Sequence, residues 1–599
     1  MIAIPSFEHV AIVGDDAWLA AEISSLFTRP RRYLTVMDGP RLTRPDYTNE
    51  VIRRTNALSL AQTRRVVFAN LPADQSCALS ERQPAGMFIS ANTREEARSA
   101  LRGWTKGPAE KLAWGRDHLG VGLLLARRSK KFLDTAEETS PPINFVSGGT
   151  HLLIVCEAGE DLAEVTGSNL AFATDASFLT VPQLPDRDQD QWLEEIYALG
   201  SGENVTTRFA CIRDRVRTRL PAFDFREYKQ VLFITNGFPW GMAMPERPTT
   251  HLFAYPDLGR MIVEGIWAAS RTGKSARTAL LIQSDHIAGS EIEAIRESLK
   301  QNQTLVRIQA GPRATVHNVR MLLETVPFDI VVISTHAGDV SGKRVTYKFT
   351  DSEGIARCLV VDEAVGFGYD PTTEKVCVQT FCRFHELDGV DWSDSVAKSS
   401  LYVGSAISTW SAMGDVQERA KYRVASEEII RVNGSMGLRM SDDVWLPMMH
   451  GFAPGCTPIV FNNACSSWHE LSKRFMFPGA SAYIGTLFPV TEAEAQAVGT
   501  SFFQRELGKS LPVALWASQN HVYERQDRRP YAMCGLPFSS IQRNTIDSIA
   551  FLSQYYPRAI ATLSRKANTT AIEELRENFI QQKDFLSKEA EILADWIRS

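Results

Sequence analysis

The chain lacks the features that would place it in a membrane, outside the cell or on nucleic acid. It contains no apolar run of the roughly 18 residues that a membrane-spanning helix needs. Its first residues, MIAIPSFEH, show no basic segment followed by a long apolar core, which argues against a secretory signal. The 9 cysteines are scattered and odd in number, and a net charge of −5 gives no pull toward nucleic acid. We therefore expect a cytoplasmic protein with no membrane contact and no direct nucleic-acid partner.

Motifs for cofactors are incomplete as well. Residues 14–16 (GDD) follow an apolar strand but lack the second and third glycines of a dinucleotide fingerprint. Residues 273–275 (GKS) resemble the end of a phosphate loop, but Ala268 stands where that loop needs a glycine. Metal-ligand residue types cluster in one region without a convincing four-ligand zinc pattern: Cys358, Cys377, Cys382 and His385. We expect no cofactor and no metal.

At 599 residues the chain is too long for one hydrophobic core, and it divides into several predicted units. Residues 1–142 read as a small α/β unit of unknown role. Residues 143–270 read as a second α/β unit, suited to sensing a signal or docking a partner. Residues 275–545 form the unit with the sharpest pattern, interrupted by a long insertion at about 340–455. Residues 546–599 are a charged helical tail.

Strands and helices alternate from residue 275 onward. Residues 278–282, 304–308 and 329–334 are apolar and β-branched, and helical patterns at 291–301 and 315–325 separate them. This alternation predicts parallel strands joined by helical crossovers, a doubly wound α/β sheet.

Two of the predicted strands end in reactive side chains. Residues 328–338 (FDIVVISTHAG) end at His336, and residues 458–467 (PIVFNNACSS) end at Cys465. Open parallel sheets place their sites at the carboxyl ends of the strands. A histidine and a cysteine presented in this way suggest a thiolate nucleophile with an imidazole partner.

Each candidate residue has a chemical role in that interpretation. Cys465 is the nucleophile, and a helix beginning soon after it would lower the thiol pKa through its first amides. His336 is the general base and acid, with His450 as the rival base. The backbone amides of Gly338 and Cys465 would stabilise an oxyanion.

A third, orienting group is not singled out by spacing. Asn462, Asn463 and Asp339 are all close in sequence to the pair, and the sequence does not decide between them.

The two motifs, in this order, resemble the CHAT family of caspase-like peptidases, relatives of caspases, separase and gingipains. The resemblance rests on residues 333–338 (ISTHAG), 460–467 (VFNNACSS) and 479–490 (GASAYIGTLFPV), with a helix at 493–507 after them. It covers residues 275–545, and residues 1–270 show no resemblance that we can name.

The resemblance implies a caspase-like, mostly parallel doubly wound sheet and a Cys–His dyad that cleaves a protein substrate. The dyad would be Cys465 and His336, with Gly338 in the oxyanion role. Members are commonly paired with sensor domains, in bacteria often in antiviral or cell-death programmes, so an activating protein or ligand would act through the amino-terminal half.

Departures from the family leave an alternative open. Ser467 stands where caspases have glycine, and the stretch between His336 and Cys465 is far longer than in caspases. Within it, residues 343–369 are rich in β-branched residues, and residues 419–432 are predicted to be mostly helical. This insertion and the unrecognised amino-terminal half also fit a catalytically silent scaffold that only binds partners.

Overall fold

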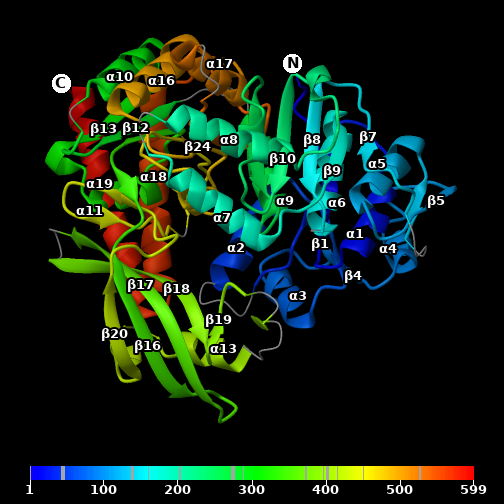
Figure 1. Cartoon of the computed structure of the whole chain (residues 1–599), viewed down its shortest axis with the longest axis horizontal. Helices are drawn as coiled ribbons and strands as arrows, with labels where there is room; N and C mark the ends of the chain where they lie inside the picture. The colour runs from blue at the N-terminus through cyan, green and yellow to red at the C-terminus, as the bar shows by residue number, and fades with distance from the viewer. Residues whose placement is uncertain are drawn as a thin grey trace.

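The computed structural model describes residues 2–41, 47–135, 140–159, 161–200, 204–271, 277–287, 289–370, 374–394, 397–398, 404–414, 416–449, 451–524 and 528–598. Within these residues the chain is a mixed α/β protein with largely parallel sheets and a helical carboxyl-terminal region, as the sequence predicts (Figure 1). No helix in the described ranges is long and apolar enough to cross a membrane.

The amino-terminal unit is built on a four-stranded parallel sheet in the order β2-β1-β3-β4, with a small two-stranded sheet of β5 and β6 beside it. Its elements are β1 (Ser6–Val13), α1 (Ala17–Ser25), β2 (Arg32–Met37), α2 (Tyr47–Leu60), β3 (Arg65–Ala69), α3 (Ala73–Ser80), β4 (Phe88–Ala91), α4 (Arg94–Ala100), β5 (Lys111–Ala113), α5 (Leu119–Ser129) and β6 (Phe132–Asp134).

The next unit forms one end of a large sheet, in the order β11-β10-β8-β9-β7. Its elements are β7 (Phe145–Val146), β8 (Leu152–Glu157), α6 (Asp161–Thr174), β9 (Ser177–Val181), α7 (Asp186–Tyr197), α8 (Val205–Arg217), β10 (Gln230–Thr235), β11 (Thr249–Phe253) and α9 (Leu258–Ser270), with short 3-10 turns at Phe225–Glu227 and Trp240–Ala243.

The carboxyl-terminal half forms the other end of the same sheet, in the order β13-β12-β14-β23-β24-β25. Its elements are β12 (Thr278–Gln283), α10 (Glu291–Gln301), β13 (Leu305–Ala310), a 3-10 turn (Gly311–Arg313), α11 (Val316–Thr325), β14 (Ile330–Ser334), β23 (Ile459–Asn462), α15 (His469–Met476), β24 (Ala482–Thr486), α16 (Glu492–Arg505), α17 (Leu511–Tyr523) and β25 (Tyr531–Gly535).

The two ends of this eleven-stranded sheet repeat one strand order and run in opposite directions. The first end has the order β9-β8-β10-β11 and the second has the order β13-β12-β14-β23. In each group of four, the strand that comes second along the chain lies outermost, followed by the first, the third and the fourth. β11 is parallel to its neighbour β25, but β25 is antiparallel to β24. The parallel strands of the first end therefore point opposite to those of the second, and their carboxyl ends lie at opposite edges of the sheet.

In the carboxyl-terminal half, both faces of the sheet are buried, which explains why its strands are apolar without a break. In β14, Val331 and Ile333 join the core on one face, while Ile330 and Val332 join a separate core on the other. Alternation along a strand fixes this division. Because the side chains on both faces belong to hydrophobic cores, polar side chains reach a pocket at or beyond the ends of these strands.

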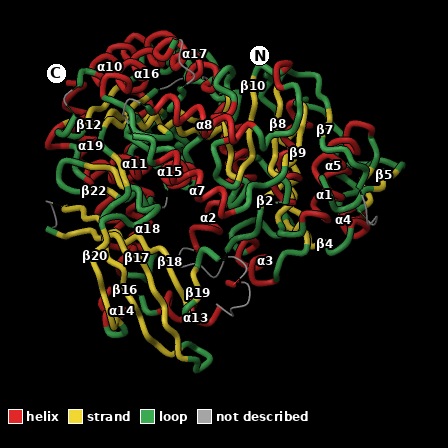
Figure 2. The backbone as a smooth tube through the Cα atoms, in the orientation of Figure 1, coloured by secondary structure: helices red, strands yellow, loops and turns green. Residues whose placement is uncertain are grey.

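The insertion between β14 and β23 is mainly antiparallel and projects from the body of the molecule (Figure 2). It holds a five-stranded sheet, β19-β18-β17-β16-β20, and a three-stranded sheet, β15-β21-β22. Its elements are β15 (Ala337–Gly338), β16 (Gly342–Thr350), β17 (Ala356–Asp370), β18 (Lys375–Leu387), β19 (Val390–Asp391), α13 (Gly404–Ala412), α14 (Val416–Ala420), β20 (Arg423–Ile429), β21 (Gly437–Arg439) and β22 (Val444–Trp445).

The prediction that residues 419–432 are mostly helical is wrong. α14 ends at Ala420, and the residues that follow form the edge strand β20, paired antiparallel with β16. Pairing with a strand some eighty positions earlier decides the conformation of this segment, and local helix preference does not. The predicted helical tail is present as α18 (Ser548–Thr569) and α19 (Glu573–Arg598).

Candidate active site

His336 and Cys465 follow two adjacent parallel strands. β14 pairs with β23 in the register Ile330 with Ile459 through Ile333 with Asn462. Their carboxyl ends therefore lie together at one edge of the sheet. His336 stands two residues past the end of β14 with an exposed side chain, and Cys465 stands three residues past the end of β23.

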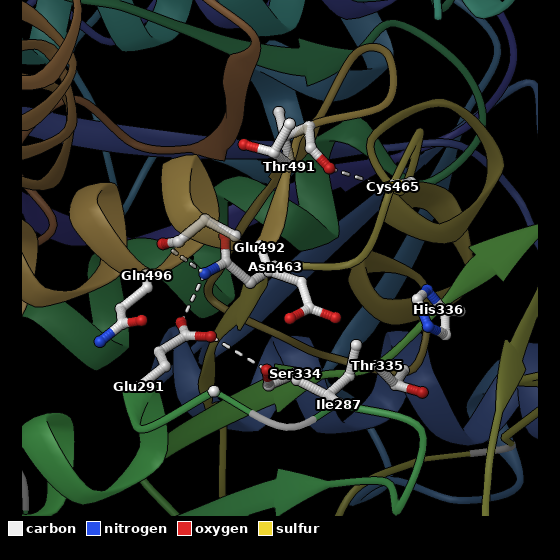
Figure 3. Close-up of a pocket in the computed structure, with 13 residues that line it drawn as sticks. Ile287, Glu291, Ser334, Thr335, His336, Asn463, Cys465, Thr491, Glu492 and Gln496 are labelled. Carbon is white, nitrogen blue, oxygen red and sulfur yellow. Dashed lines mark hydrogen bonds between the residues drawn. The ribbon is translucent and has the colours of Figure 1, made fainter. Parts of the chain in front are cut away.

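Both side chains line the same pocket, which has a volume of about 70 Å³ (Figure 3). The start of α10 and the first turns of α16 complete its wall, through Glu291, Glu492 and Gln496 among others. The pair expected from the strand ends is thus brought together at the edge where a parallel sheet presents its sites.

Among the described residues, no hydrogen bond joins the thiol of Cys465 to the His336 ring. The thiol donates a hydrogen bond to the carbonyl oxygen of Val490, at 3.5 Å (Figure 3). In the part of the chain that the structure describes, the His336 ring makes no hydrogen bond. The thiol and the imidazole therefore share a pocket without a hydrogen bond between them.

Burial raises the pKa of the Cys465 thiol above its usual value, and the charge of Glu494 adds to this, although backbone N–H groups at Val490 and at Cys465 itself act the other way. The helix expected to lower the pKa, α15, begins only at His469. A lowered pKa from helix amides is therefore not found, and the thiol carries its proton at neutral pH in this conformation.

The loop that carries Cys465 is held by a buried polar network. The Ser467 hydroxyl donates to the carbonyl of Asn462 at 3.2 Å and accepts the Thr486 amide at 3.0 Å. The Tyr483 hydroxyl donates to the carbonyl of Ser467 at 2.8 Å. Ser466 has a left-handed backbone with φ of 50°, a conformation that costs free energy for a residue other than glycine. Surrounding bonds therefore hold the turn in place.

Glu291, at the start of α10, is a pocket residue that the sequence reasoning missed. It is 3% exposed, and its carboxylate accepts hydrogen bonds from the Ser334 hydroxyl at 2.9 Å and from the Asn463 amide. Burial raises its pKa to about 7 despite these two bonds. The sequence carried one signal for it, since an acidic residue closely follows β12 at the same sheet edge as His336.

Asn463, one of the expected orienting residues, is fixed beside Glu291. Its amide also donates to the carbonyl of Ala495 at 2.8 Å, and its side-chain oxygen accepts the Tyr531 hydroxyl. These bonds make Asn463 part of the pocket floor. Asn462 turns away toward the hydroxyl of Tyr483, at 2.9 Å.

Asp339, the other expected orienting residue, is tied to a different part of the chain. It accepts a hydrogen bond from Arg431 at 2.8 Å, and Arg431 also forms a two-bond ion pair with Glu194 on α7. The Asp339 amide donates to the Tyr197 hydroxyl at 3.1 Å. Gly338 lies in β15, opposite Gly437 of β21, and is not among the described residues that line the pocket.

Two of the remaining sequence candidates lie beyond the part of the chain that the structure describes. His450 and residues 273–275 fall outside the described residues. Among the residues that are described, no group of three or more histidine, cysteine or acidic side chains is arranged to hold a metal ion.

Comparison with known proteins adds little to this geometry. No protein-family model matches the chain, and no curated protein matches it. A solved structure to which it is similar is Cwp6 from Clostridium difficile, at 11% identity and a TM-score of 0.22, covering 59% of this chain. The chain spans 62% of the length of that protein, less than two thirds.

Proposed function

We propose that the chain is a site-specific cysteine endopeptidase of the caspase-like type, with Cys465 as nucleophile and His336 as general base and acid. The observation that carries the proposal is the meeting of these two side chains in one pocket at the ends of adjacent parallel strands. The mostly parallel sheet with helices on both faces is also the fold that the CHAT resemblance implies.

The proposed reaction follows from the chemistry of the pair. His336 takes the thiol proton, and the Cys465 sulfur bonds to the scissile carbonyl carbon. The protonated imidazole then gives its proton to the leaving amine as the C–N bond breaks. Water, deprotonated by His336, cleaves the thioester and releases the new carboxylate and the thiol. The backbone amides of Gly338 and Cys465 are the oxyanion donors that the CHAT resemblance implies, and the Gly338 amide would have to move to the pocket, because Gly338 lies in β15 and does not line it here.

The arrangement described above suits a resting state of such an enzyme. A protonated thiol bonded to Val490 must turn toward His336 before it can react. Rotation about one side-chain bond moves the sulfur without moving the loop, whose backbone the Ser467 network holds. Activation in this scheme is a change of side-chain partner.

An activating protein or ligand acting through the amino-terminal half is the proposed trigger. Support comes from α7, which belongs to that half and contacts the segment just after His336. Arg431 joins Glu194 of α7 to Asp339, and its guanidinium lies 4.2 Å from the Tyr197 ring centre. A partner that shifts α7 would thereby shift the segment that carries His336.

The alternative, a catalytically silent scaffold, has an observation in its favour. The raised pKa of Cys465 and its bond to Val490 describe an ordinary half-buried thiol as well as a resting nucleophile. Cleavage assays separate the two proposals.

The test is cleavage of a proteome-derived peptide library by the full chain, with new amino termini identified by mass spectrometry. Because rotation of the Cys465 side chain needs no partner, we expect wild type alone to produce recurrent cleavage sites at a basal rate, and Cys465→Ala and His336→Ala to produce none. Cys77→Ala, which removes an exposed cysteine remote in sequence from the pocket motifs, is the matched control. The same termini from Cys465→Ala would contradict the proposal, and no termini from wild type would favour the scaffold.

A further inference from the structure

The pocket beside Cys465 has an uneven charge. Two carboxylates line it, those of Glu291 and Glu492, and no lysine or arginine does among the described residues. Figure 3 shows both carboxylates directed into the space that His336 and Cys465 border. Glu291 is buried and lies deep in the pocket, whereas Glu492 is exposed and lies at its mouth.

No positively charged side chain balances the Glu291 carboxylate among the described residues. Its two hydrogen-bond donors, Ser334 and Asn463, are neutral, and no ion pair to Glu291 is present within the described part of the chain. Buried carboxylates are normally paired with a cation. Each carboxylate oxygen can accept a further hydrogen bond beyond the one it already accepts. A cation from outside the chain would complete the site.

The size of the pocket limits what can enter. A volume of about 70 Å³ corresponds to roughly five water positions, which matches one extended side chain. The polar walls at Thr335 and Gln496 provide further groups for hydrogen bonds. A lysine or arginine side chain fits these dimensions and these acceptors, whereas an aspartate would meet the carboxylate of Glu492 and the carboxyl of Glu291, whose pKa burial raises to about 7.

We propose that this pocket receives the side chain of the residue that precedes the scissile bond and that it selects lysine or arginine. Glu291 pairs with the cation at the depth of the pocket, and Glu492 attracts it at the mouth. The inference rests on the proposed function, because the pocket selects a residue only if Cys465 attacks the carbonyl next to it.

The experiment uses four peptidyl acyloxymethyl ketones that differ only in the residue before the reactive carbon: arginine, lysine, norleucine or aspartate. Each reacts with a catalytic thiol, and peptide mapping locates the label. The rate of labelling of Cys465 is measured on the full chain for wild type, Glu291→Gln, Glu492→Gln and Glu492→Lys. Glu293→Gln, which removes an exposed carboxylate from the same helix, is the matched control.

We expect wild type to react with the arginine and lysine probes roughly ten to a hundred times faster than with the aspartate probe, the range for a charge-assisted contact. Glu291→Gln should remove most of that preference, and Glu492→Lys should turn it toward aspartate. Glu293→Gln should leave the ratio unchanged. Since Glu492 is exposed, its variants keep the test valid even if Glu291→Gln does not fold.

The two proposals fail in different ways. Equal labelling by the arginine and norleucine probes, or faster labelling by the aspartate probe, overturns the pocket assignment and leaves the peptidase intact. Absence of Cys465 labelling by all four probes overturns the proposed peptidase, and the pocket assignment falls with it.

Discussion

The buried carboxyl of Glu291 makes the stability of the protein depend on pH in a direction that can be calculated. Its pKa in the folded chain is about 7, against an ordinary value of 4.5, and burial is the main cause. Between these two pH values the unfolded chain loses the Glu291 proton while the folded chain keeps it. Stability therefore falls as pH rises through this window, and the loss is complete above pH 7.

The size of the effect follows from the difference between the two pKa values. Each pKa unit is worth about 1.36 kcal/mol, so a change from 4.5 to about 7 amounts to about 3 kcal/mol. Glu291→Gln keeps the shape of the neutral acid and cannot ionise. The free energy of unfolding of wild type should therefore decline relative to that of Glu291→Gln by about 3 kcal/mol between pH 4.5 and pH 7.

The measurement is urea unfolding followed by tryptophan fluorescence at several pH values for wild type, Glu291→Gln and the exposed control Glu293→Gln. Subtracting the variant from wild type cancels the groups that both chains share. A difference between wild type and Glu291→Gln that stays constant with pH, or that grows as pH rises, would refute the reasoning. Glu293→Gln should show the same pH dependence as wild type.

Two further substitutions test the supports of the pocket. Ser467→Ala should lower the free energy of unfolding by about 1–3 kcal/mol, because the Thr486 amide loses its buried acceptor; urea unfolding checks this, and an unchanged midpoint would contradict it. Arg431→Ala should speed amide exchange in β15 and leave β14 unchanged, because it removes the link from Asp339 to Glu194. Equal exchange of the β15 amides in Arg431→Ala and in wild type would show that α7 does not hold this segment.

Much of the carboxyl-terminal half could be predicted because its signals are local. The apolar run at residues 278–282 and the helical pattern at 291–301 coincide with β12 (Thr278–Gln283) and α10 (Glu291–Gln301). The helix expected at residues 493–507 is present as α16, which begins with a capping box between Thr491 and Glu494. Runs bounded by turn residues need no distant partner to be recognised. Predicting that His336 and Cys465 lie close together needed one further step of reasoning, which is that neighbouring parallel strands end at the same edge of the sheet.

What the sequence could not provide depends on contacts between distant segments. Strand β20 exists because β16 offers it a partner. Glu291 is at a helix start, a position where an acidic residue usually needs no other explanation, and only its burial beneath Ser334 and Asn463 makes it unusual. The rise in the Cys465 pKa likewise comes from burial by segments that the local sequence does not reveal.

The opposed directions of the two ends of the large sheet limit how the amino-terminal half can influence the pocket. Its strands end at the edge away from Cys465, so they cannot contribute strand-end side chains there. α7 spans the distance instead. Gln189, in its first turn, bonds to the carbonyl of Asn236 beyond β10, and Tyr197, its last residue, accepts the amide of Asp339. Its 12 residues measure about 18 Å, close to the length of a six-residue strand such as β10. Because a helix moves as a rigid element, displacement at the strand ends of one half would reach the segment after His336 in the other.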